Sequence, residues 1–162
     1  MMPEVLFAPW RYEYLVAEKS NGCIFCRAAA SDDEEESLVV YRGRRVFVLL
    51  NRYPYTNGHL MVAPYEHTGD LARLDVASAN ELMQVTQRAV DVLEGAYHPD
   101  AFNVGLNLGK AAGAGVPDHL HVHVVPRWTG DTNFMPVVGE TKVLPESLEQ
   151  TYDRLEPVFH RA

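Results

Sequence analysis

The chain has little of what defines secreted, membrane-spanning or disulfide-stabilised proteins. Its 162 residues include only two cysteines, too few for a disulfide framework. No apolar run approaches the roughly 20 residues that cross a bilayer. The first segment, MMPEVLFAPWRYEYL, is interrupted by prolines and charges, whereas a secretory signal needs an unbroken apolar stretch. We therefore expect a cytoplasmic protein without a membrane partner.

Positive charge is also scarce. Fourteen Lys and Arg residues stand against 22 Asp and Glu, a formal net charge of −8. A field of this sign repels a phosphate backbone, so nucleic acid is not an expected partner. Part of the excess lies in one acidic run, residues 31–37, which is typical of a solvated loop. A small anionic substrate would need local donors such as backbone N–H groups, His, Asn or Arg.

Several segments carry the alternation and turn residues of β-strands. Residues 38–50 predict a hairpin around Arg-Gly-Arg. Three further strands are predicted, one that ends at Pro64 and two in the second half of the chain: residues 59–63, 102–108 and 118–126.

Two helices are predicted as well. Ser78 and Glu81 have capping-box spacing, and apolar residues follow at helical intervals until Pro99 stops the helix. Residues 145–160 predict a second helix, with Pro145 suited to its first turn. Because strands and helices do not alternate regularly, the pattern predicts an α+β fold with a mainly antiparallel sheet.

Three histidines alternate with apolar residues in the last predicted strand, DHLHVHVVP. His119, His121 and His123 take one face of that strand. Core packing does not require this row, because each buried imidazole needs a partner for its N–H. Two interpretations remain open: the histidines hold a catalytic metal, or one of them is a nucleophile whose neighbours handle protons and phosphate oxygens.

The segment before this row favours the nucleophile. Asn103, Gly105 and Asn107 share one face of the preceding strand, and residues 109–117 form a glycine-rich loop that leads to the histidines. Backbone N–H groups in such a loop can make a nest for an anion. A phosphate ester is therefore the favoured class of substrate.

With these residues in view, the sequence resembles the histidine triad (HIT) superfamily of nucleotide hydrolases and transferases. Residues 119–125 are similar to its H-φ-H-φ-H-φ-φ signature, where φ is apolar. Residues 51–54 and 58–64 are similar to its upstream substrate segment, so the match runs from about 38 to 127. Residues 102–128, with the Gly-Asp-Thr-Asn-Phe that follows, most resemble bacterial diadenosine tetraphosphate (Ap4A) phosphorylases.

The resemblance implies a HIT-like fold and an enzyme. The fold has a five-stranded antiparallel sheet, one long helix and a C-terminal helix, commonly paired into a homodimer. We expect a single HIT domain with an N-terminal extension (1–37), a core (38–128) and a C-terminal segment (129–162). The implied activity splits dinucleoside polyphosphates through an adenylyl-histidine intermediate that inorganic phosphate or water releases, without an organic cofactor. There are two alternatives. One is a HIT-type nucleotide hydrolase that acts on Ap3A, Ap4A or an adenylate ester. The other is a nucleotide-binding module with little turnover, and the intact triad argues against it.

The resemblance also assigns roles to single residues. His121, the middle histidine, is implied as the nucleophile, and a neutral imidazole with one nitrogen bonded to a carbonyl presents its other lone pair. His123 and His59 would donate to phosphate oxygens or to the leaving group. Asn51 resembles a ribose-contacting position, and Asn107 a phosphate-contacting one.

One departure from the family concerns the loop before the triad. Many HIT hydrolases carry a glutamine there, whereas Ala114 and Gly115 occupy that region here. Gly113, Ala114 and Gly115 are small, so backbone amides can approach an anion closely, but such a loop admits water as easily. The resemblance to the phosphorylases decides, and it implies phosphate as the acceptor. Trp128 could border the substrate pocket or be buried at a subunit contact.

The C-x-x-C of Cys23 and Cys26 has several interpretations. A redox pair expects a βαβ context and a helix N-terminus, neither of which the sequence predicts here. Two buried thiols or half of a zinc site remain. In HIT proteins with a similar C-x-x-C, a histidine after the Pro-ended strand and the first triad histidine complete a structural zinc site. The resemblance thus implies His67 and His119 as ligands, in which case His119 is not a proton donor.

Overall fold

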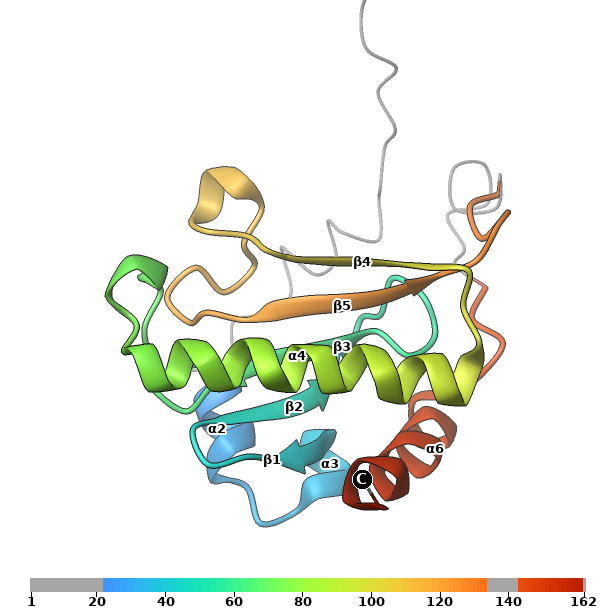
Figure 1. Cartoon of the computed structure of the whole chain (residues 1–162), viewed down its shortest axis with the longest axis horizontal. Coiled ribbons are helices and arrows are strands. Elements are labelled where there is room, and N and C mark those ends of the chain that lie inside the picture. Colours follow the sequence, from blue (N-terminus) through green and yellow to red (C-terminus); the bar gives the residue numbers. More distant parts are fainter. Residues whose placement is uncertain (1–21, 134–142, 162) are drawn as a thin grey trace, which may run out of the picture.

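A five-stranded antiparallel sheet with the strand order β1-β2-β3-β5-β4 forms the centre of the molecule (Figure 1). The structure is a computed structural model that describes residues 22–133 and 143–161. The α+β fold with a five-stranded antiparallel sheet, expected from the sequence, is confirmed. The strands are β1 (Val39–Arg42), β2 (Val46–Leu50), β3 (Leu60–Pro64), β4 (Ala101–Leu106) and β5 (Val122–Arg127).

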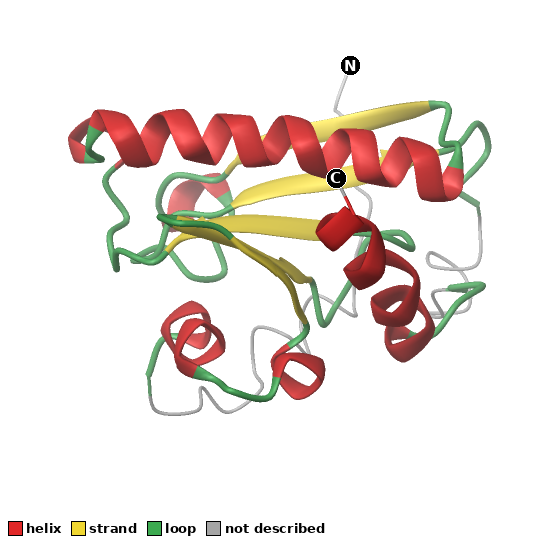
Figure 2. Ribbon diagram, turned by 60° about the horizontal axis from the view of Figure 1, so that its bottom comes forward, coloured by secondary structure: helices red, strands yellow, loops and turns green. Residues whose placement is uncertain are grey.

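Helices cover both faces of this sheet. The long helix α4 and the C-terminal helix α6 pack on one face, while the short helix α2 packs on the other (Figure 2). The short helix α3 lies next to the edge strand β1 (Figure 1). None of the helices in the described ranges is long and apolar enough to span a bilayer. Their bounds are α2 Ile24–Ala30, α3 Glu34–Ser37, α4 Val76–Tyr97 and α6 Leu148–Arg161, with 3-10 turns at Leu71–Arg73 and Lys110–Ala112.

Alternation along the strands divides the apolar core into two clusters, because successive side chains point to opposite faces. The larger cluster lies under α4 and α6 and includes Val48, Val62 and Val124. The smaller lies on the opposite face and joins α2 to the sheet through Phe25 and alternate strand residues. The histidine row faces this second side, because the apolar residues between the histidines belong to the first cluster.

The long helix begins earlier than the Ser78–Glu81 spacing predicts. Asp75 is its N-cap, and the Asp75 carboxylate accepts the backbone N–H of Ser78 at 3.0 Å. Glu81 instead accepts a backbone N–H from the β1–β2 turn. The end of the helix at Tyr97, two residues before Pro99, agrees with the prediction.

The C-terminal helix begins later than predicted. Pro145 lies outside it, and the first helical residue is Leu148. Ser147 and Gln150 form a reciprocal capping box: the Ser147 hydroxyl accepts the Gln150 N–H at 3.2 Å, and Oε1 of Gln150 accepts the Ser147 N–H at 2.9 Å. The signal that sets the start of the helix is therefore this Ser-x-x-Gln and not Pro145.

The strand that follows the glycine loop is shorter than predicted. The ladder starts at Val122, so His119 and His121 lie just before β5 rather than inside it. The reason is a competing hydrogen bond: the N–H of Leu120 donates to the carbonyl of Thr68, in the loop after β3, at 2.7 Å. The chain therefore leaves the sheet before Val122, but Leu120 still packs in the same core cluster as Val122.

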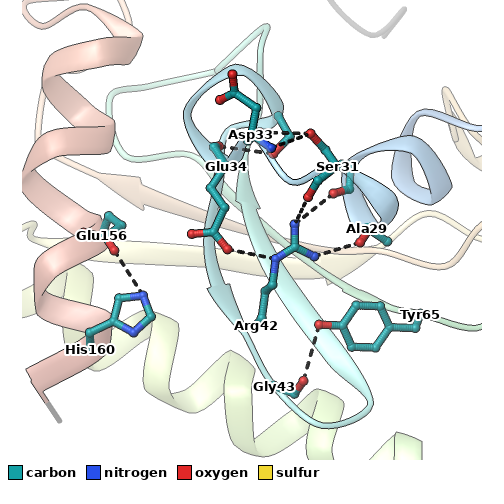
Figure 3. A network of polar contacts seen from close by, with 11 residues as sticks. Ala29, Ser31, Asp33, Glu34, Arg42, Gly43, Tyr65, Glu156 and His160 are labelled. Carbon is teal, nitrogen blue, oxygen red and sulfur yellow. Dashed lines mark hydrogen bonds and ion pairs between the residues drawn. The ribbon is translucent and has the colours of Figure 1, made fainter.

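The acidic run is more structured than a solvated loop. It contains helix α3, which Asp33 caps by accepting the N–H of Glu36 at 2.9 Å. Arg42 of β1 pairs with Glu34 at 2.9 Å and also donates to carbonyl oxygens at the end of α2, those of Ala29 and Ser31 among them (Figure 3). One guanidinium thus ties both short helices to the edge of the sheet.

Gly58 supplies a stability test, because its φ of +78° is left-handed and an added Cβ would lie 3.0 Å from Leu93 and 3.1 Å from Tyr97. Gly58→Ala should lower the free energy of unfolding by about 1–3 kcal/mol. Gly95→Ala is the matched control, because Gly95 lies in α4 with open space around it, and should raise stability by about 0.5–1 kcal/mol. Urea denaturation measures both. Equal stability of the two variants would contradict the strained-turn assignment.

Candidate active site and metal centre

His121 is held in one tautomer by the backbone. Its Nδ1 lies 2.8 Å from the carbonyl oxygen of His119. Since a carbonyl only accepts, Nδ1 carries the proton and Nε2 keeps its lone pair. The imidazole is buried, and this burial lowers the pKa of His121, which favours the neutral form. The arrangement is the one expected of a nucleophilic imidazole.

A chain of three groups orients His123. The backbone N–H of Tyr55 donates to Nδ1 of His59 at 3.1 Å, so the ring proton of His59 is on Nε2. That Nε2 lies 2.9 Å from Nδ1 of His123 and donates to it. The proton of neutral His123 is therefore on its own Nε2, while the rings of His121 and His123 meet edge to face at 4.9 Å. The structure thus brings together the three histidines predicted as catalytic.

Two aromatic rings near these histidines were missed in the sequence. Tyr55 packs against His59, with ring centroids 4.5 Å apart. Phe25 stacks on His121 at 4.6 Å and is only 1% exposed. Sequence position alone could have pointed to Phe25, because it lies between the two cysteines.

The turn that carries His59 is fixed from three sides. The Thr56 hydroxyl donates to the carbonyl of Pro126 at 2.8 Å, and the Asn57 amide donates to the carbonyl of Glu146 at 2.8 Å. Gly58 packs closely against α4. The position of the His59 ring is therefore set by β5, by α4 and by the segment before α6.

The two asparagines predicted to contact substrate lie at strand ends. Asn51 follows β2, half-buried, and its side-chain oxygen accepts the N–H of Tyr53 at 2.9 Å. Asn107 comes directly after β4, in which Gly105 pairs with His123. The ladder between β4 and β5 ends one residue before Asn107, at the pair of Leu106 with Val122.

The remaining predicted substrate residues are three in the glycine-rich loop and Trp128. Gly113 has a left-handed φ of +88° and ends a 3-10 turn; Ala114 is buried and Gly115 is exposed. Trp128 follows the far end of β5, seven residues and roughly 20 Å along the strand from His121, and it packs edge-on against Tyr97. Within the described chain the structure does not bring Trp128 to the histidine row.

Four side chains converge on a second centre next to the histidine row. Their candidate ligand atoms all lie within 4.8 Å of one another, and the residues are Cys23, Cys26, His67 and His119. Sγ of Cys23 is 3.3 Å from Nδ1 of His119, and Sγ of Cys26 is 3.4 Å from Nδ1 of His67. Two thiols and two imidazoles form a donor set suited to tetrahedral coordination of a metal ion.

The second nitrogen of His119 supports this assignment. Nε2 donates to the carbonyl of Pro64 at 2.8 Å, which turns Nδ1 toward the cysteines. Metal-bound histidines commonly donate their other N–H in this way. Burial lowers the pKa of His119, and the neutral ring is the form that binds metal. The residues present fit a metal with four protein ligands.

Local structure brings the ligands together from three segments. Cys23 is the N-cap of α2, so the C-x-x-C does lie at a helix N-terminus, contrary to the sequence prediction. His67 is in the loop after β3, which packs tightly on the chain before the triad: a Cβ on Gly69 would lie 2.3 Å from the carbonyl oxygen of Pro117.

Comparison with known proteins defines the family. A HIT domain model matches residues 32–130, and the chain belongs to the HIT domain family. An AP-4-A phosphorylase from Mycobacterium tuberculosis is 51% identical over 118 residues, which cover 73% of this chain and 60% of that relative. The chain thus spans less than two thirds of that relative's length.

Solved structures share the fold. A Zn-bound histidine triad family protein from Mycobacterium smegmatis superposes with a TM-score of 0.70 at 28% identity, covering 86% of this chain and 94% of that one. A hypothetical histidine triad nucleotide-binding protein from Sulfolobus tokodaii superposes with a TM-score of 0.68 at 26% identity, covering 86% of this chain and 93% of that one.

The hydrogen bonds predict a specific set of ring tautomers. At about pH 8, above the ordinary histidine pKa of about 6.5, long-range ¹⁵N–¹H spectra should find the proton of His121 on Nδ1 and that of His119 on Nε2. His59 and His123 should both carry it on Nε2. Single histidine substitutions assign the signals. A proton on Nε2 of His121 would contradict the nucleophile geometry.

Proposed function

We propose that the chain is a nucleotidyltransferase that cleaves dinucleoside polyphosphates of the Ap4A type, with His121 as the nucleophile. The observation that carries the proposal is the bond from Nδ1 of His121 to the carbonyl of His119, which leaves Nε2 as the attacking atom. The 51% identity to an AP-4-A phosphorylase supports the substrate class.

In the first step, Nε2 of His121 bonds to the α-phosphorus, and the bond from that phosphorus to the bridging oxygen breaks. ATP leaves from Ap4A, and an adenylyl-imidazole remains. The proton on Nε2 of His123 is placed by its bond to His59 and can serve the departing oxygen. Nδ1 of His121 keeps its proton in both steps, and this N–H continues to donate to the carbonyl of His119.

In the second step, an oxygen of inorganic phosphate attacks the adenylyl phosphorus, the P–N bond breaks, and ADP leaves. Ap4A and phosphate thus become ATP and ADP. The small residues Gly113 to Gly115 support this choice of acceptor, because backbone amides at such positions can approach an anion. Asn107, the first residue after β4, is the proposed side-chain contact to phosphate, and Asn51 is the proposed contact to ribose.

The metal centre is proposed to hold a structural zinc through Cys23, Cys26, His67 and His119. Four protein ligands leave no open position for water, which is typical of structural rather than catalytic zinc. Only one triad histidine belongs to this cluster, so it gives no support to a catalytic metal on the whole row. The Zn-bound relative from Mycobacterium smegmatis supports the choice of metal. When bound, the ion would fix the N-terminal extension to the triad segment.

The remaining proposals concern assembly. β4 is an edge strand, and Val104 and Leu108 are 49% and 47% exposed, which supports a homodimer formed along this edge. Reduced thiols as metal ligands support a cytoplasmic location. The N-terminal extension supplies Cys23 and Cys26, and the C-terminal segment contacts Asn57, which supports one domain over the whole chain.

The products formed from Ap4A test the reaction. With millimolar phosphate the protein should yield ATP and ADP, and the rate should depend on phosphate. His121→Ala should lower this rate at least about a thousandfold, because it removes the attacking atom. His160→Ala, which changes an exposed histidine on α6, is the control and should keep the rate. Full-rate release of AMP without phosphate would overturn phosphorolysis; an active His121→Ala variant would overturn the mechanism.

Elemental analysis tests the metal. Protein purified without added metal should contain about one zinc per chain. Cys23→Ser or His67→Ala should release it and lower the melting temperature, since each removes one of four ligands. Asn107→Ala should retain the metal. Wild-type protein that is fully stable without metal would contradict this assignment. His119 would then again be a candidate proton donor.

A further inference from the structure

We propose that Phe25 is a positioning residue for the nucleophile and that the metal bound by the flanking cysteines holds Phe25 in place. This inference rests on the proposed function, because it assigns Phe25 a role in the chemistry of His121. It gives the C-x-x-C a part in catalysis beyond stabilising the fold.

The contact geometry is the first support. Phe25 stacks on His121 with ring centroids 4.6 Å apart and an interplanar angle of 29°, and it lies 5.0 Å from the ring of His119. The bond from Nδ1 of His121 to the backbone fixes one edge of the imidazole. The covalent link at Cγ and this one hydrogen bond still allow the plane of the ring to tilt. The flat face of Phe25 opposes this tilt and so helps to set the direction of the Nε2 lone pair.

The position of Phe25 in the chain is the second support. Phe25 lies between Cys23 and Cys26, whose sulfurs belong to the four-residue metal cluster. Ligands on both sides restrict the backbone that carries the ring. Metal at this centre would therefore restrain Phe25 more directly than the residues of α2 that follow Cys26.

The other end of α2 is anchored independently. Arg42 donates to the carbonyl oxygens of Ala28, Ala29 and Ser31 (Figure 3). A seven-residue helix has little stability of its own, so its position depends on such anchors. With the C-terminal end held by Arg42, loss of the metal would free mainly the first turn, which carries Phe25.

The competing interpretation is that Phe25 only fills the apolar cluster. Phe47 belongs to the same cluster, is equally buried at 0% exposure, and stacks on Tyr65 at 5.2 Å. Phe25→Leu and Phe47→Leu are therefore matched substitutions. Both remove a buried ring, but Phe25 stacks on His121 whereas Phe47 stacks on Tyr65.

Two readouts separate the interpretations. In zinc-loaded protein, Phe25→Leu should shift the ¹⁵N and ¹H ring signals of His121 and lower kcat for Ap4A phosphorolysis by about tenfold or more, with KM changed less than about twofold. Phe47→Leu should leave the His121 signals in place and keep kcat within about twofold. His121 signals and kcat that respond alike in the two variants would overturn the proposal.

Metal removal supplies an arm that needs no substitution at Phe25. Chelator treatment of the wild-type protein should move the His121 ring signals, and zinc should restore them. In Phe25→Leu the same treatment should move them less. Wild-type His121 signals that do not change when the metal is removed would overturn the proposal. This outcome can be measured even if Phe25→Leu does not fold. An active His121→Ala variant would instead refute the proposed function, and the ring signals would still test the contact.

Discussion

The hydrogen bond from Nδ1 of His121 to the carbonyl of His119 is the interaction on which the rest of the site depends. It decides which nitrogen of His121 keeps a lone pair. It also joins two centres, because the same His119 turns its Nδ1 toward the cysteines. A shift of the His119 backbone would therefore disturb both the nucleophile and the metal cluster. The departure of the chain from the sheet before Val122 leaves room for this double use.

The backbone, rather than other side chains, sets most of the tautomers. Carbonyl oxygens accept hydrogen bonds from the ring N–H groups of His119 and His121, and the backbone N–H of Tyr55 fixes the tautomer of His59. Backbone groups are always present and keep one protonation state, so they define a direction for proton transfer that does not depend on pH. The bond between His59 and His123, by contrast, joins two titratable rings, which suits a pair that must move a proton.

Sequence patterns predicted most of the candidate catalytic residues, but fewer of the contacts that hold those residues in place. The alternation around His121 predicted the sheet and the shared face, because strand periodicity depends only on local geometry. The helix starts at Val76 and Leu148 were missed, since several capping signals competed within a few residues. The stacking of Phe25 on His121 could not be derived, because it joins residues 96 positions apart through packing of α2. The convergence of four ligands was implied only by family resemblance, for the same reason.

Both edges of the histidine row depend on segments outside residues 32–130, the part that the HIT model matches. Phe25 supports His121 from the N-terminal side, and Glu146 holds the turn of His59 through Asn57. Burial alone would raise the pKa of Glu146, but hydrogen bonds from Arg154 and Tyr97 outweigh it and lower that pKa. Glu146 therefore stays ionised at neutral pH and keeps α4 and α6 tied beside the turn. The family core supplies the reacting groups, while the flanking segments fix where those groups point.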